Sequence, residues 1–442
     1  MEIDSDISNE EYMACDDDQI IILSADEMEE REGEDYVGEN EEEDIPLFDV
    51  VDESSGTLLE IDSSICCIDT DPIRKDCVLF GGCDDKAYIS NLPNRIVNKE
   101  NRVNIGYTHI FDGHSDTVSC VSYSKDGKYF ATGGCEGAIR VYFNDNDNYG
   151  NLLKVLEGPS DELEYITWHP KGPCILGGGV DKTSWLWMLP EGNVISVLSG
   201  HGDSVTCGDF TNDGKLVCTG SLDGSVIIWN PKSGVSVHKI SSKSFSESAI
   251  IDKELMLDDN VGVVSLKCHR INPIIAVGLT NGLFSLIHSE TGKILNSNLN
   301  HHDSLNCLEF NHIINDPLIA TGDMSGELII WNYEYNRINH TMKHEKFEHS
   351  NGVLPGITSL CWAGNKCGST LITTGCLDGT IRVWDYRSGE NIKTLKGHRS
   401  GIMSMKVIDS SINHVDYSDN DYIIRVVSAG DDGRCLLWDI RK

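Results

Sequence analysis

The sequence predicts an all-β propeller, with eight blades as the preferred count and seven as the alternative if one degenerate copy is a loop. A segment recurs eight times and is clearest as GSLDGSVIIWN around Trp229 and GCLDGTIRVWD around Trp384. Successive copies are 42 to 58 residues apart, close to the ~40 to 45 residues of a four-stranded blade with its loops. Apolar residues alternate within a copy, as at Val226 and Ile228. This period of two is that of strands and excludes stacked helices.

Each copy contains a turn position six residues before a closing aromatic residue or its replacement. The turn positions are Asp84, Glu136, Asp181, Asp223, Asn281, Ser325, Asp378 and Asp432. The closing residue is a tryptophan in five copies, at Trp187, Trp229, Trp331, Trp384 and Trp438. A Gly-His pair precedes several copies and supplies His114, His201 and His398.

This pattern predicts a buried polar relay inside each blade. The loop histidine, a strand serine or threonine, the turn carboxylate and the indole N–H are expected to bind one another, because a buried polar group left unpaired costs about 1 to 3 kcal/mol. The histidine and aspartate residues of the pattern are therefore interpreted as structural, and the cluster His301-His302-Asp303 is interpreted in the same way. Three copies depart from the pattern: one ends at Ile287, one at Ser90, and in one Ser325 replaces the turn aspartate. We expect those blades to lack a complete relay and to depend on apolar packing.

The last copy ends after its third strand, so its blade needs an outer strand from elsewhere. The segment TLLEI at residues 57–61 precedes the first inner strand, at residues 65–69, and has suitable length and apolar content. We predict that this segment pairs with the C-terminal blade and closes the ring, which leaves no long sheet edge open.

Charge divides the chain into an acidic tail, residues 1–55, and the propeller, residues 56–442. Residues 1–53 contain 23 Asp or Glu and one basic residue, Arg31, and the whole chain has a net charge of −36. The tail is expected to be disordered, with one apolar patch at residues 20–23. It is either a solubilising segment or a counter-charge for a basic partner. Direct binding to nucleic acid is disfavoured, because that affinity comes from Lys and Arg. A basic protein, held by salt-sensitive attraction, is the expected ligand.

No pattern indicates a cofactor, a metal or a catalytic site. The 16 cysteines include no paired C-x-x-C motif and are expected to be reduced thiols. Nucleotide-binding, hydrolase and zinc-protease motifs are missing, so an enzyme is not expected. The sequence shows neither a secretory segment nor a run long enough to cross a bilayer. We expect a soluble, cytoplasmic and possibly also nuclear protein that is monomeric.

The candidate binding site is an acidic ring around one mouth of the propeller channel. Alignment of GPSDELEYITW with GHGDSVTCGDF puts Glu162 and Glu164 on channel-facing positions, next to Asp161. The other carboxylates predicted for this rim are Asp116, Asp203, Asp258, Asp259, Asp303 and Asp431. The alternative is that these aspartates only fix loop geometry. That alternative is weakest for the two glutamates, because their loop has lost the histidine.

The repeats resemble those of the WD-repeat family over about residues 56–442. GGCDDKAYIS, EGPSDELEYITWHP, the pair Trp185 and Trp187 followed by LPEGN, and AVGLTNG resemble, in order, the angio-associated migratory cell protein family, which has a fungal chaperone branch. The resemblance implies a non-enzymatic chaperone whose acidic face holds the basic N-terminal segment of a new large-subunit ribosomal protein. Glu164 lies inside a matching motif. A general scaffold, such as a ubiquitin-ligase substrate receptor or signalling platform, and a histone-binding propeller are the alternatives.

Overall fold

The computed structural model divides the chain into two units, Met1–Leu47 and Phe48–Lys442. The structure describes residues 12–16, 19–23, 51–93, 103–144, 149–249, 261–311, 313, 316–345, 355–363, 370–408 and 423–441. In the first unit, β1 (Tyr12–Asp16) and β2 (Gln19–Leu23) form an antiparallel pair. These two strands depart from the expectation of a wholly disordered tail. The apolar patch at residues 20–23 forms most of β2.

The described residues of the second unit form eight sheets, which confirms the preferred blade count. Blades 1 to 4 consist of β4 (Ile65–Thr70), β5 (Cys77–Gly82), β6 (Ala87–Asn91) and β8 (His109–Phe111); β9 (Val118–Tyr123), β10 (Tyr129–Gly134), β11 (Ile139–Asn144) and β12 (Tyr149–Leu156); β13 (Leu163–Trp168), β14 (Cys174–Gly179), β15 (Thr183–Met188) and β16 (Asn193–Ser199); and β17 (Val205–Phe210), β18 (Val217–Ser221), β19 (Ser225–Asn230) and β20 (Val235–Ser241).

Blades 5 to 8 continue the same order. They consist of β21 (Val263–Cys268), β22 (Ile274–Leu279), β23 (Leu283–His288) and β24 (Ile294–Leu299); β25 (Cys307–Phe310), β26 (Leu318–Gly322), β27 (Glu327–Asn332) and β28 (Arg337–Lys343); β29 (Ile357–Trp362), β30 (Leu371–Cys376), β31 (Thr380–Asp385) and β32 (Glu390–Lys396); and β33 (Ile402–Ile408), β34 (Ile423–Gly430), β35 (Arg434–Arg441), β3 (Gly56–Glu60) and β7 (Val103–Asn104). A short helix, α2 (Ser242–Ser248), lies between blades 4 and 5.

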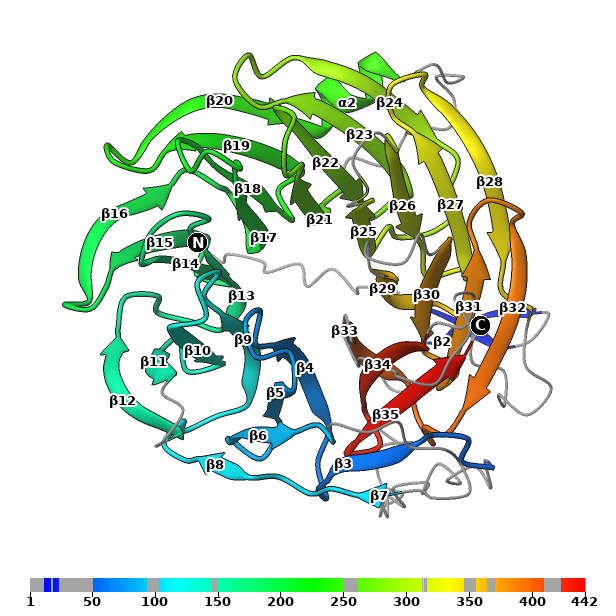
Figure 1. The fold of residues 1–442 in the computed structure, drawn as a ribbon. Coiled ribbons are helices and arrows are strands. Elements are labelled where there is room, and N and C mark those ends of the chain that lie inside the picture. Colours follow the sequence, from blue (N-terminus) through cyan, green and yellow to red (C-terminus); the bar gives the residue numbers. More distant parts are fainter. Residues whose placement is uncertain are drawn as a thin grey trace, which may run out of the picture. The chain divides into compact units, whose positions relative to one another are not determined.

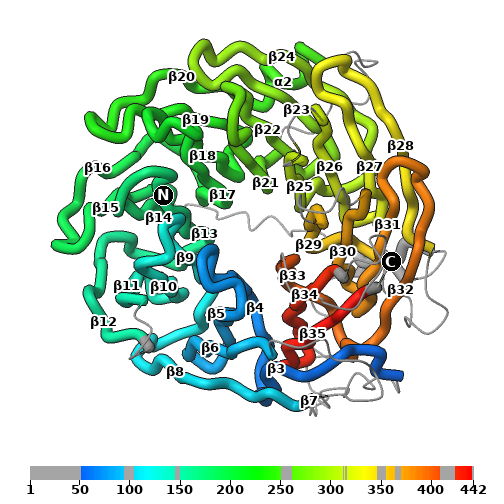
Figure 2. Tube along the Cα trace, in the orientation of Figure 1, coloured from blue at the N-terminus to red at the C-terminus, as the bar shows by residue number. Residues whose placement is uncertain are grey.

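The blades of the second unit are arranged as a ring around a channel (Figure 1). The first strand of each blade is the innermost, and it contacts the innermost strand of the next blade. The last inner strand, β33, contacts the first, β4, so the ring is closed (Figure 2). Because strands alternate in direction, the loop that enters each inner strand and the turn between the second and third strands lie at the same end of a blade. We call this end the upper face.

The predicted ring closure is confirmed. Strand β3 pairs antiparallel with β35 and supplies the outer strand that the last copy lacks, and β7 adds in parallel to β3. Leu58 and Leu59 of β3 are buried in one apolar cluster with residues of blades 1 and 8. Residues 52–55, which composition assigns to the tail, lie against this closure, and Asp52 forms an ion pair of 3.0 Å with Arg434.

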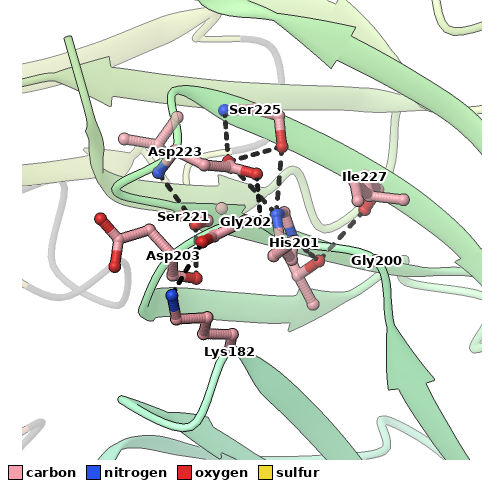
Figure 3. Close-up of polar contacts among 12 residues, drawn as sticks. Lys182, Gly200, His201, Gly202, Asp203, Ser221, Asp223, Ser225 and Ile227 are labelled. Atoms are coloured by element: carbon pink, nitrogen blue, oxygen red, sulfur yellow. Dashed lines mark hydrogen bonds and ion pairs between the residues drawn. The ribbon is translucent and has the colours of Figure 1, made fainter. Parts of the chain in front are cut away.

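The polar relay has its full form in blade 4 (Figure 3). The Trp229 indole donates to the Thr219 hydroxyl at 2.8 Å, and that hydroxyl contacts His201 Nε2 at 2.7 Å. His201 Nδ1 lies 3.0 Å from Ser225 Oγ and 3.4 Å from the Asp223 carboxylate. Burial lowers the pKa of His201 to about 4, against the opposing effect of Asp223. The imidazole is therefore neutral at pH 7, and the relay joins the entering loop to the turn.

Blades 2 and 8 have related relays. In blade 8, His398 contacts Ser428 Oγ at 2.7 Å and Asp432 at 2.9 Å, and Trp438 donates to Ser428. In blade 2, His114 contacts Thr132 at 2.7 Å, and Glu136 replaces the turn aspartate at 2.6 Å.

Blade 6 differs from expectation. Asp323, two residues before Ser325, is the carboxylate of this blade and lies 3.1 Å from His301 Nδ1. His301 Nε2 contacts Thr321 at 2.7 Å, and Trp331 donates to the same hydroxyl at 2.9 Å. The prediction that this blade lacks a relay is wrong, because the carboxylate comes from the end of the preceding strand.

Blade 7 contains a histidine that the sequence reading missed. His344 contacts Thr374 Oγ1 at 3.2 Å, although a lysine precedes it where other copies have glycine. Trp384 donates to Thr374, and Asp378 forms an ion pair of 2.7 Å with Arg382. The distance along the chain from histidine to hydroxyl is 30 residues, the same as from His398 to Ser428. The separation is 18 residues in blades 2 and 4 and 20 in blade 6, so no single spacing identifies His344.

Blade 3 has no complete relay. Asp181 accepts from the backbone and hydroxyl of Thr183 and from the backbone of Ser160. The Trp187 indole N–H is buried without a hydrogen-bond partner among the described residues, because Gly177 stands ten residues before it, where blade 4 has Thr219. This indole therefore contributes packing and no polar connection.

Blades 5 and 1, the other two copies that depart from the pattern, have no histidine, hydroxyl and tryptophan relay among the described residues. In blade 5, a pair of buried serines, Ser285 and Ser297, contact each other at 2.6 Å among buried apolar side chains. In blade 1, the Ser90 hydroxyl donates to the Gly106 carbonyl at 3.0 Å.

Candidate partner-binding face

Four aspartates occupy the same loop position just before an inner strand, on the upper face. Each accepts a hydrogen bond from the N–H of the next residue, at 2.7 Å for Asp116, 3.0 Å for Asp161, 2.9 Å for Asp203 and 2.7 Å for Asp303. This bond uses one carboxylate oxygen and fixes the loop, which is the structural role weighed above. The second oxygen makes no hydrogen bond in the part of the chain that the structure describes. Asp116, Asp161 and Asp203 are exposed, and Asp303 is half-buried.

Glu164 occupies a bulge in the inner strand of blade 3. The register between β13 and β14 shifts between Leu163 and Tyr165, so Glu164 has no cross-strand partner and is exposed. An equivalent bulge occurs in most inner strands, and such an extra residue re-aims its side chain. Partial burial raises the pKa of the Glu164 carboxyl, and the neighbouring charge of Glu162 raises it further.

Hydroxyl side chains at the equivalent bulges connect one blade to the next. Ser119 donates to the Leu163 carbonyl at 2.7 Å, Thr206 to the Val263 carbonyl at 2.7 Å, and Thr358 to the Ile402 carbonyl at 2.5 Å. An ionised glutamate has no proton to donate in this way. Blades 1, 5 and 8 have Cys66, Val264 and Met403 at the corresponding bulge, so the hydroxyl is not used in every blade. Glu164 brings an exposed negative charge to this position.

Asp431 is exposed on the turn between the second and third strands of blade 8. Its carboxylate accepts from the Ser64 hydroxyl at 2.5 Å and from the Ser400 hydroxyl at 3.0 Å. These two serines lie in the loops that enter the inner strands of blades 1 and 8. Asp431 is thus held in place at the junction of these blades.

The carboxylates of blades 8, 2 and 3 lie within electrostatic range of the same group of thiols. The pKa of Cys135 is raised to about 11, first by burial and then by Glu162 and Asp116. The pKa of Cys66 is raised to about 12, first by burial, then by Cys83, and further by Cys135 and Asp431. We call Asp431, Asp116, Asp161, Glu162 and Glu164 the acidic arc. It extends over blades 8, 1, 2 and 3, with neutral thiols between its carboxylates.

The arc does not continue unchanged around the ring. Lys182, on the turn between the second and third strands of blade 3, donates to the Gly202 carbonyl at 3.0 Å and brings a positive charge beside Asp203 of blade 4 (Figure 3). Asp303 lies on blade 6, away from the arc. Asp258 and Asp259 lie outside the described residues. Of the carboxylates predicted for the rim, most of those that the structure describes therefore lie on one side of the channel mouth and are not spaced evenly around it.

The lower end of the channel has a different character. A cavity of about 530 Å³ lies there, and its lining includes Lys267, Arg270 and Lys406. Lys406 forms an ion pair of 3.5 Å with Asp69. The lining also includes Asp71 and Glu309, so charges of both signs occur at this end of the channel.

Comparison with known proteins agrees with the repeat pattern. The model of the WD domain, G-beta repeat, matches residues 106–142, 192–230, 343–385 and 389–439. The chain is a member of the WD40-repeat family. No helix in the described part of this WD40 protein has the length and apolar character needed to span a membrane.

Two curated relatives of this WD40 protein match most of its length. It is 26% identical over 387 residues to the human (Homo sapiens) angio-associated migratory cell protein, covering 84% of this chain and 79% of that protein. It is 22% identical over 348 residues to the ribosome assembly protein SQT1 of Saccharomyces cerevisiae, covering 74% of this chain and 75% of that protein.

Two solved structures share the propeller fold. Sqt1 of Saccharomyces cerevisiae has a TM-score of 0.73 at 19% identity, covering 88% of this chain and 99% of that chain. Sqt1 of Chaetomium thermophilum, bound to the N-terminus of the ribosomal protein L10, has a TM-score of 0.70 at 19% identity, covering 88% of this chain and 100% of that chain. At this identity the structures show a common fold.

Proposed function

We propose that this WD40 protein is a non-enzymatic chaperone that holds the basic N-terminal segment of a newly made large-subunit ribosomal protein on its acidic arc. The observation that carries the proposal is the placement of Glu162 and Glu164 on the upper face. Both are exposed, and Glu164 stands where blades 2, 4 and 7 have a hydroxyl that binds the next blade. The arc therefore has a charge that the propeller itself does not require.

The affinity of such a face comes from several weak contacts. An exposed ion pair is worth only about 0.2 to 1 kcal/mol, so one carboxylate does not hold a peptide. Five carboxylates of the arc neutralise several Lys or Arg side chains of one extended segment, and partial desolvation at the channel mouth strengthens each contact. A net charge of −36 adds long-range attraction for a cationic chain.

Release requires no chemical step in this scheme. Ribosomal RNA is a polyanion that competes with the arc for the same cationic segment, and its charge density favours transfer as the large subunit assembles. The similarity to Sqt1, one structure of which contains the N-terminus of L10, supports the choice of a ribosomal protein over other basic partners. General scaffolds and histone-binding propellers remain the competing functions.

The proposal is tested by capture from cells of the chain's own source. The tagged protein is purified at low salt, bound proteins are identified by mass spectrometry, and the capture is repeated with a Glu162→Lys/Glu164→Lys double variant. One basic large-subunit ribosomal protein is expected to dominate and to disappear with the variant. A diverse set of partners that is insensitive to the charge reversal would refute the proposal and favour a general scaffold. Recovery of histones as the dominant partner would refute it in favour of the other alternative.

A further inference from the structure

The relay of blade 6 contains one carboxylate more than the others. Four residues before the closing tryptophan, Ser225 in blade 4 and Thr380 in blade 7 each donate a hydroxyl hydrogen bond of 2.6 Å to the turn carboxylate. Arg434 occupies this position in blade 8 and donates its backbone N–H to Asp432. Blade 6 has Glu327 there. Blade 6 thus lacks the hydroxyl donor or the positive charge found at this position in the other three blades. An ionised glutamate provides neither a hydrogen-bond donor nor a positive charge.

Glu327 is buried close to Asp323 and His301. Their exposed fractions are 9% for Glu327, 0% for Asp323 and 3% for His301. One ligand atom from each residue lies within 4.8 Å of those of the other two. Glu327 Oε2 is buried without a hydrogen-bond partner among the described residues. His301 Nδ1 is buried beside the Asp323 carboxylate, 3.1 Å away, and makes no well-aligned hydrogen bond in this part of the chain.

Neither carboxylate of this group has a compensating Lys or Arg. In the described residues no ion pair joins a Lys or Arg to Asp323 or Glu327, and Lys343, opposite Glu327 in the β27–β28 register, is exposed. Asp323 accepts only from uncharged donors besides His301: the Glu327 N–H at 2.7 Å, the Ser325 hydroxyl at 2.8 Å and the His302 N–H at 3.3 Å. Burying two uncompensated carboxylates costs several kcal/mol. Either bound protons or a metal cation must balance this group.

We propose that His301, Asp323 and Glu327 bind a divalent transition-metal ion, Zn²⁺ in the first instance. One imidazole nitrogen and two carboxylate oxygens are ligands that Zn²⁺ accepts, with a fourth position left for water or another donor. The contact of His301 Nε2 with the Thr321 hydroxyl, at 2.7 Å, orients the ring and leaves Nδ1 directed at the carboxylates. Two positive charges balance the two carboxylates. The site joins the loop that enters blade 6 to its turn, and its role is structural.

The experiment uses the untagged full chain, because a histidine tag binds the same metals. The protein is stripped with a chelator and dialysed, zinc is titrated with a competing indicator, and bound metal is counted by mass spectrometry. Glu327→Gln keeps the shape of the side chain and removes its charge, and Glu334→Gln, at an exposed position of the same blade, is the matched control. The wild-type chain and the control are expected to bind one more equivalent of zinc than Glu327→Gln. Chelation is expected to lower the Tm of these two proteins only.

Equal zinc content in the wild-type chain and Glu327→Gln would overturn the proposal. So would an unchanged Tm on chelation, which would mean that a proton compensates the second carboxylate. If Glu327→Gln does not fold, cobalt substitution of the wild-type chain decides. Visible absorption of tetrahedral Co²⁺ without a thiolate charge-transfer band supports a His and carboxylate site. No absorption, or a strong thiolate band, contradicts it.

Discussion

Reversing the charge of Glu162 and Glu164 is the most direct test of the acidic arc. Both side chains are exposed on the upper face, and Glu164 makes no hydrogen bond in the described structure, so the double change to lysine removes no contact that the fold uses. The expected result is weaker binding of a cationic peptide with an unchanged Tm. Separation of binding from stability is what distinguishes a binding position from a structural one.

The size of the effect follows from the number of ion pairs. Loss of two exposed pairs costs about 0.4 to 2 kcal/mol, and repulsion from two new lysines adds a similar amount. The sum of about 1 to 4 kcal/mol corresponds to a Kd that rises from about 5-fold to several hundred-fold, at 1.4 kcal/mol for each factor of ten.

The assay is fluorescence anisotropy with a labelled N-terminal peptide of the ribosomal protein L10 of the same organism, repeated at several salt concentrations. The wild-type affinity is expected to fall as salt rises, and the gap between wild type and variant is expected to narrow, because salt screens these contacts. Glu191→Lys is the matched control: Glu191 is exposed on blade 3, in the turn between its third and fourth strands at the lower end. Glu191→Lys changes the net charge by half as much as the double variant. A loss of binding free energy in the control that is half of that in the double variant would mean that net charge alone acts, and an unchanged Kd in the double variant would refute the arc.

Three further predictions concern the propeller itself. Thr219→Val leaves His201 and the Trp229 indole without their shared hydroxyl. Because two buried groups lose their partner, denaturant unfolding is expected to show a free energy of unfolding lower by about 2 to 6 kcal/mol. A decrease below about 1 kcal/mol would contradict the relay. The pKa of His201 is lowered from 6.5 to about 4 in the fold, so the unfolded chain binds the proton first as the pH falls. The free energy of unfolding has its full value above pH 6.5 and is expected to fall by about 3 kcal/mol as the pH decreases to 4. Melts recorded across this pH range should show a smaller dependence for His201→Gln. Deletion of residues 51–60 removes Leu58 and Leu59 from the core and uncovers the edge of β35; we expect a lower Tm and concentration-dependent association in light scattering, whereas a stable monomer would show that β3 is dispensable.

The fold was predictable because its signals repeat. Eight similar segments specify eight sheets, and even the closure by residues 57–61 follows from counting the strands of the last copy. The errors occurred where one copy departs from the common spacing. Asp323 performs the role assigned to Ser325 from two positions earlier, and His344 was missed because a lysine precedes it. A carboxylate or an imidazole reaches the same relay atoms from more than one position along the chain, so a fixed spacing does not identify it.

The candidate site was less predictable than the fold, for a physical reason. Sequence alignment gives the carboxylates of the entering loops, yet each of those aspartates also fixes its own loop. Their presence alone therefore does not separate binding from folding. Residues that are close only in space, such as Lys182 beside Gly202, decide where negative charge accumulates. The local sequence pattern does not reveal such neighbours.

The inner-strand bulge provides the missing criterion. At this position the propeller repeatedly uses a hydroxyl to bind the next blade, as Ser119, Thr206 and Thr358 do. A glutamate at this position lacks the hydrogen bond to the next blade and adds a carboxyl group. Partial burial raises the pKa of that carboxyl in Glu164. Such a residue is unfavourable for the scaffold taken alone. Blades 2 and 4, on either side of blade 3, keep the hydroxyl, whereas blades 1, 5 and 8 have Cys66, Val264 and Met403 at this position. In the proposed function, a basic partner supplies the charge that offsets the cost at Glu164.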